Sequence, residues 1–162
     1  MLQKMHGMFT QSDDDGNFEV KYYKGKNGIN KIYEAAFAAK ELRSYVNLSL
    51  MSSLMPGNGD MFAEALKKNN EIQIYEIIDG SPESRAKTNS FGQSVKTLER
   101  YTYKFLPDNV SLTAADILIY DGYVSIINIG ERPTGVVLKN NDYYKNSKEL
   151  FDFIWQLLPE NK

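Results

Sequence analysis

The chain has 162 residues, of which 42% are hydrophobic and 12% aromatic, enough for one sizeable core and too few for two ordinary domains. It contains no cysteine, which excludes disulfide scaffolds, thiolate nucleophiles and cysteine-based zinc sites. The formal net charge is −2 and the basic residues are scattered, so the chain alone is predicted to bind DNA poorly.

The sequence has no membrane signal. No apolar run approaches the roughly 20 residues that a membrane helix requires, and residues 1–9 lack the apolar segment of a signal peptide. We therefore expect a soluble, cytoplasmic chain with no membrane partner.

Hydrophobic periodicity switches repeatedly between two and 3.6 residues, which indicates alternating strands and helices and an α/β fold. At the N-terminus, Leu2, Met5 and Phe9 lie at helical spacing, and a polar break over residues 12–17 follows. We expect residues 1–17 to be a linker-helix remnant with its loop, and residues 18–162 to form the domain. A frayed terminus is the alternative, because Gly7 weakens any helix.

The remaining elements follow in chain order. The pattern predicts strands at residues 19–23, 44–50, 71–78, 101–106, 115–120, 123–128 and 134–138. It predicts helices from residues 25–28 to Leu42, from a cap at Asn58 or Asp60 to Lys68, over residues 84–98 and over residues 142–158. Between two of the strands, Asp121-Gly122 suits the tight turn of a hairpin.

Several familiar site patterns are incomplete in this chain. An acidic run ends in Gly16, but aligning that glycine with the sixth position of a calcium loop puts Tyr22 where a bidentate glutamate is needed. The glycine-containing segment at residues 24–28 lacks the full phosphate-loop pattern, and the only histidine, His6, leaves the serines without a catalytic base. We therefore predict no metal site and no cofactor.

Acidic side chains gather around the predicted hairpin. Asp116, Asp121 and Glu131 lie close in sequence, but nothing in their spacing requires acid–base chemistry. Asp121 fits a residue that caps its own turn. Asp116 begins a strand whose residues Ile117 and Ile119 should be buried, so its carboxylate points either into a cleft or to water.

Three segments carry a family resemblance: VKYYKGKNGINKIYEAAFAAKELRSYVN at residues 20–47, YTYKFLP at residues 101–107, and ADILIYDGYVSIIN through FDFIW at residues 115–155. In order and spacing they resemble the effector domain of TrmB-type transcriptional regulators, which are prokaryotic proteins. The resemblance implies a phospholipase D-like fold, a mixed sheet with helices on both faces. In that family a linker helix joins this domain to a winged helix-turn-helix.

The chain offers no room for a winged helix-turn-helix before Val20. We therefore expect either an excised sensor domain or a stand-alone relative, with DNA bound only through a separate or missing module. The chain also stops after Leu158, without the β-rich region through which longer TrmB-type proteins bind sugars, so sugar recognition is not carried over.

The phospholipase D signature reads His, one residue, Lys, four residues, Asp, six residues and Gly-Ser-x-Asn. Anchored on Asp121, it places Ala114 at the histidine and Asp116 at the lysine, so only the aspartate remains. The superfamily's reaction needs a histidine nucleophile and a lysine that stabilises phosphate charge. We therefore expect no catalytic residues and no enzyme.

With that reaction lost, the former active-site cleft becomes the default candidate for a sensory pocket. We predict that it is lined by Asn47, Ser49, Asp116, Asp121 and Asn128. The predicted function is a noncatalytic effector-sensing and dimerisation domain, in which an unknown small-molecule effector favours one geometry of a homodimer. A divergent metal-dependent phosphodiesterase or nuclease and a ligand-free oligomerisation module are the alternatives.

Overall fold

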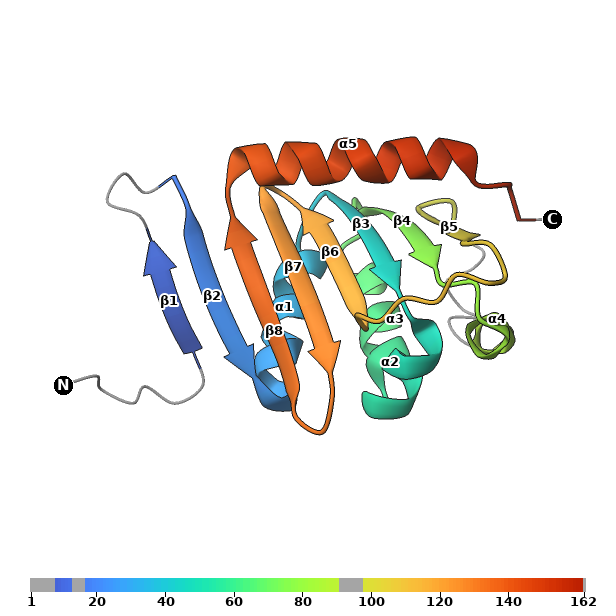
Figure 1. The fold of residues 1–162 in the computed structure, drawn as a ribbon, viewed down its shortest axis with the longest axis horizontal. Coiled ribbons are helices and arrows are strands. Elements are labelled where there is room, and N and C mark those ends of the chain that lie inside the picture. The colour runs from blue at the N-terminus through green and yellow to red at the C-terminus, as the bar shows by residue number, and fades with distance from the viewer. Residues whose placement is uncertain (1–7, 13–16, 91–97, 162) are drawn as a thin grey trace.

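The computed structural model describes residues 8–12, 17–90 and 98–161. They form one eight-stranded sheet in the order β1-β2-β8-β7-β6-β3-β4-β5 (Figure 1). The strands are β1 (Met8–Ser12), β2 (Glu19–Lys24), β3 (Glu41–Val46), β4 (Gln73–Ile78), β5 (Tyr101–Phe105), β6 (Asp116–Tyr120), β7 (Tyr123–Ile129) and β8 (Pro133–Lys139). The pairs from β1 through to β3 are antiparallel, and β3, β4 and β5 are parallel.

Helices cover both faces of this mixed sheet, as predicted for a phospholipase D-like α/β fold. One large apolar core joins α1 (Gly25–Phe37), α2 (Leu48–Leu54) and α3 (Asn58–Lys68) to one face. A smaller apolar core joins α5 (Asn141–Leu157) to the opposite face, which α5 crosses as a long helix (Figure 1). The short helix α4 (Pro82–Thr88) follows β4.

Helix α1 packs tightly on the sheet because β8 contributes a glycine beneath it. A Cβ added at Gly135 would lie 2.4 Å from Cδ1 of Ile32. Ile29 and Ile32 are both fully buried in the large core. Glycine therefore allows the two isoleucines to approach the backbone of β8.

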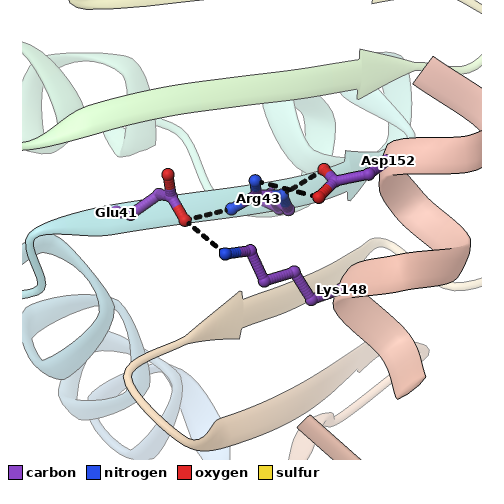
Figure 2. A network of polar contacts seen from close by, with 4 residues as sticks. All are labelled: Glu41, Arg43, Lys148 and Asp152. Atoms are coloured by element: carbon purple, nitrogen blue, oxygen red, sulfur yellow. Dashed lines mark hydrogen bonds and ion pairs between the residues drawn. The ribbon is translucent and has the colours of Figure 1, made fainter. Parts of the chain in front are cut away.

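Charged side chains of β3 bind charged side chains of helix α5 and so attach the helix to the sheet (Figure 2). On β3, Nε of Arg43 donates to Oδ1 of Asp152 at 2.6 Å, and Nη2 donates to Oδ2 at 3.2 Å. Arg43 also pairs with Glu41, which Lys148 of α5 contacts at 3.2 Å. A bidentate arginine–carboxylate pair restricts geometry as well as adding energy, so this network sets the position of α5.

The C-terminal end of α5 is held by Lys104 of β5. Its Nζ donates to the carbonyl oxygens of Trp155 at 3.1 Å and Leu158 at 3.0 Å. The last carbonyls of a helix have no partners within the helix and carry partial negative charge, so an ammonium group is a suitable cap.

The sequence-based boundaries need correction at four places. Leu42 belongs to β3, and Leu48 begins α2, where a strand over 44–50 was predicted. The described part of the predicted linker-helix remnant, residues 8–12, forms β1 and pairs with β2. Backbone pairing within the sheet outweighs the weak helical spacing there. The helix predicted over 84–98 begins at Pro82 and ends at Thr88, while residues 91–97 lie outside the described residues.

Candidate functional site

Asp116 occupies the position that the phospholipase D signature gives to lysine, and it is the first residue of β6. Its backbone pairs with Val46 of β3, and Ser44 of the same strand pairs with Glu76 of β4. Alternate residues of a strand share a face, so Asp116, Ser44 and Glu76 all point toward the layer of α1, α2 and α3. Three neighbouring strands thus place two carboxyl groups in the large core.

Neutral hydroxyl groups hold these two carboxyl groups. The Tyr33 hydroxyl of α1 donates to Oδ2 of Asp116 at 2.8 Å. Glu76 accepts from the Tyr101 hydroxyl at Oε2 and from the Ser44 hydroxyl at Oε1, the latter at 3.3 Å. None of these donors carries a charge, so the groups that hydrogen-bond the two carboxyl groups form no ion pair with them.

A small cavity lies between the pair and the helices. Its volume is about 20 Å³, which is room for one water molecule. Oδ1 of Asp116 and Nδ2 of Asn58 are buried atoms without a hydrogen-bond partner in the described part of the chain. The lining residues are Tyr33, Phe37, Leu42, Ser44, Val46, Leu48, Met51, Asn58, Phe62, Ile74, Glu76, Asp116 and Leu118. One acceptor and one donor therefore remain available to an occupant.

Burial dominates the electrostatics of this acidic cavity. It raises the pKa of Asp116 well above that of an ordinary aspartate, and nearby Glu76 adds to the shift, which the hydrogen bond from Tyr33 opposes. Burial also raises the pKa of Glu76, despite hydrogen bonds from Tyr101 and Ser44. The same desolvation keeps the pKa of both tyrosines well above its usual range. The cavity therefore favours protonated carboxyl groups.

Two other predicted pocket residues, Asn47 and Ser49, lie near the start of β6, but their hydrogen bonds involve backbone groups and do not reach into the cavity. Oδ1 of Asn47 accepts from the Leu50 amide at 3.0 Å and caps α2, while its Nδ2 donates to the Leu112 carbonyl at 2.8 Å. The backbone amide of Asn47 donates to the Ala115 carbonyl. The Ser49 amide donates to Oγ of Ser84 at 3.0 Å. These contacts join α2 to its surroundings next to the cavity.

Asp121 and Asn128 lie elsewhere. Asp121 is at the opposite end of β6, about 16 Å along the strand from Asp116, in a turn where its φ is 41° and that of Gly122 is 89°. It borders a separate surface hollow of about 270 Å³ with Lys21, Tyr23 and Lys31. Asn128 is exposed, and it lies on the face of α5 because its neighbour Ile127 pairs with Asp116. The structure therefore does not gather the five predicted residues in one pocket.

Sequence reasoning missed Tyr33, Asn58, Glu76 and Tyr101. A signal existed for Glu76, because it shares the phase of Ile74 and Ile78 in an alternating strand, where a charged residue is out of place. The tyrosines carry no comparable signal, since an aromatic side chain at helical or strand spacing usually belongs to a core.

The described residues contain no group of three or more histidine, cysteine, aspartate or glutamate side chains that could hold a metal ion. Within the same residues, no helix is long and apolar enough to cross a membrane.

Comparison with solved structures places this fold among known ones. The archaeal chromatin protein TrmBL2 superposes with a TM-score of 0.59 at 16% identity, over 88% of this chain and 54% of TrmBL2, so the chain spans about half of that protein. The phospholipase D family member Nuc from Salmonella typhimurium gives 0.62 at 12% identity, over 90% and 99% of the two chains. Phosphatidylserine synthase from Haemophilus influenzae gives 0.63 at 12% identity, over 90% and 40%.

No protein-family model and no curated protein sequence matches the chain. The likeness in structure nevertheless establishes a phospholipase D-like fold, which the matched half of TrmBL2 shares. It contradicts our expectation that the chain is no enzyme, because a phospholipase D family member and a phosphatidylserine synthase are among the similar structures. The missing histidine and lysine of one signature are too narrow a basis for excluding catalysis.

Proposed function

We propose that this chain is the effector-sensing and dimerisation domain of a cytoplasmic, TrmB-like transcriptional regulator whose DNA-binding winged helix-turn-helix is a separate module. The observation that carries the proposal is Asp116, which stands at the signature's lysine position and faces a small, mostly apolar cavity together with Glu76. The similarity of the fold to that of TrmBL2 supports the same reading.

The charge of the cavity disfavours a phosphodiester ligand bound by basic side chains. A phosphoryl group needs positive charge or an array of donors around it. Here the ionisable groups that line the cavity are Tyr33, Glu76 and Asp116, and none of the lining residues is basic. An anion would find no positive charge to compensate its own, whereas a neutral or cationic species would find an acceptor at Asp116 and a donor at Asn58.

Sensing would proceed by a shift of population. A ligand changes the equilibrium between two conformations only by as much as it binds one of them better. The cavity has room for one water molecule, so a larger effector would select a more open arrangement of the helices over β3 and β6. In a homodimer, that change would alter the spacing of the attached recognition helices.

A thermal-shift screen of metabolites tests the proposal. A ligand present at about 100 times its dissociation constant should stabilise the chain by roughly 2.7 kcal/mol. We expect Asp116→Ala to abolish this response. Asp121→Ala, at the other end of the same strand, serves as the matched control, and Asn47→Ala, Ser49→Ala and Asn128→Ala test the remaining predicted residues. A ligand whose effect is unchanged in Asp116→Ala would contradict the placement of the site.

A metal-dependent phosphodiesterase is the second candidate, favoured by the two carboxyl groups in one cavity and by the enzymes among the similar structures. Divalent cations bound by carboxylates can activate water and neutralise phosphate charge. Turnover of bis-p-nitrophenyl phosphate with added Mg²⁺ or Mn²⁺, lost in Asp116→Asn and kept in Asp121→Asn, would favour this candidate. No turnover, no stabilising metabolite and no pH dependence of stability that requires Asp116 would together favour a ligand-free oligomerisation module.

A further inference from the structure

We propose that the effector sensed by this domain is the proton itself, taken up and released by the carboxyl pair of Glu76 and Asp116. This inference rests on the proposed sensory function and names its ligand. It depends on the enclosure of the pair, on the groups that face it and on the atoms that the fold leaves without partners.

Enclosure limits what can reach the pair. Glu76 is 8% exposed and Asp116 is 5% exposed, and the cavity between them and the helices admits one water molecule. A metabolite cannot enter without displacing helices that belong to the large core. A proton needs only a transient chain of water to move between the bulk solvent and a carboxyl oxygen.

Every element around the pair contributes a neutral group. The hydroxyl of Tyr33 comes from α1, that of Ser44 from β3 and that of Tyr101 from β5. α3 contributes the amide of Asn58, and α2 contributes Leu48 and Met51. Because none of the described lining residues is basic, two ionised carboxylates would have no compensating charge. Holding a proton is the least costly way to bury them.

The unpartnered atoms indicate how the protonated pair is completed. A water molecule in the cavity would accept hydrogen bonds from the protonated Oδ1 of Asp116 and from Nδ2 of Asn58, the two cavity atoms that are buried without partners among the described residues. As the pH rises, each carboxyl group releases its proton to bulk water, and no other bond is made or broken. Two ionised carboxylates then repel each other, which favours a cavity opened to solvent.

The electrostatics agree with this geometry. Burial raises the pKa of both carboxyl groups, and the proximity of Glu76 raises that of Asp116 further. An exposed carboxyl group of the unfolded chain releases its proton near pH 4. Between that pH and the higher pKa of the folded pair, the folded chain holds a proton that the unfolded chain has lost. Its stability therefore falls as the pH rises.

The experiment measures urea unfolding of the full chain from about pH 5 to about pH 9 in a His6→Gln background, which removes the only histidine. For one proton held by the folded state, the folding equilibrium constant should fall about tenfold per pH unit. Asp116→Asn and Glu76→Gln should each reduce this slope, and Asp121→Asn should keep it. Parallel slopes in all four proteins would overturn the inference.

Carbon-13 NMR of the carboxyl groups gives a second readout that does not depend on the variants folding. An Asp116 resonance that titrates near pH 4 contradicts the inference, and one that titrates well above it supports it. Failure here leaves the wider sensory function testable, because a stabilising metabolite found in the thermal-shift screen would still support that function.

Discussion

The Tyr33 hydroxyl donates to Oδ2 of Asp116 at 2.8 Å and so ties helix α1 to strand β6 inside the acidic cavity. Tyr33→Phe should destabilise the chain by about 1–3 kcal/mol, because it leaves a buried carboxyl group without this donor. The hydrogen bond favours the ionised carboxylate, so its loss should raise the pKa of Asp116 further and make the destabilisation larger at pH 8 than at pH 5. Urea unfolding at both pH values measures this, with the exposed Tyr143→Phe as control. An equal loss at both pH values would contradict the assigned role.

The Arg43–Asp152 pair should account for much of the attachment of α5. Arg43→Met leaves Asp152 without its bidentate partner and should reduce the free energy of unfolding by about 2 kcal/mol, less than a fully buried pair loses because Asp152 is partly exposed. Urea unfolding checks the value. Lys67→Met removes an exposed surface pair with Glu64 and is the control, expected to have little effect. If the two variants lose the same stability, the network of Figure 2 has no special part in positioning α5.

Lys104 should control the last turn of α5. In Lys104→Met the carbonyls of Trp155 and Leu158 lose their ammonium donor, at a cost of about 1–2 kcal/mol. Hydrogen exchange of the amides at residues 154–158 should accelerate, while exchange in the first turns of α5 should change little. Lys145→Met, on the exposed surface of the same helix, provides the comparison. Uniform acceleration along the helix would point to loss of the whole packing layer instead.

Gly80 is predicted to be irreplaceable for steric reasons. A Cβ at this position would lie 1.8 Å from the carbonyl oxygen of Pro107, so Gly80→Ala must push apart the segments that follow β4 and β5. We expect a loss of about 3 kcal/mol or more, or no folded protein. Gly130→Ala, which meets no atom within 4 Å, should be tolerated. Circular dichroism and thermal unfolding of the two variants provide the test.

Much of the strand pattern could be predicted because alternation and turn residues are local signals. The hairpin of β6 and β7 is an example, since Asp121-Gly122 supplies two residues with positive φ between two alternating runs. The boundary between α1 and β3 was harder to predict from the sequence. Leu42 continues the helical spacing of Ile29 and Ile32, yet it belongs to β3 because pairing with β4 and β6 decides its conformation.

Asp116 is the only residue of the candidate site that could be predicted, because the phospholipase D signature assigns a lysine to its position. Its partners come from α1, α3, β4 and β5, and no spacing within the sequence reports such long-range proximity. The five predicted residues were placed by the order of strand ends along the chain. Asp121 shows the weakness of that reasoning, because one antiparallel strand carries it to the end of the sheet opposite Asp116.

Arg43 and Ser44 are consecutive residues of β3 and therefore face opposite layers: Arg43 reaches α5, and Ser44 reaches the acidic cavity. A slip of β3 by a single residue would exchange their surroundings. The guanidinium would be carried to the side of Glu76, and the short hydroxyl would be left beneath Asp152. A misregistered chain would lose both the contact of Arg43 with α5 and the contact of Ser44 with Glu76. These two neighbouring residues therefore also disfavour an incorrect register of β3 during folding.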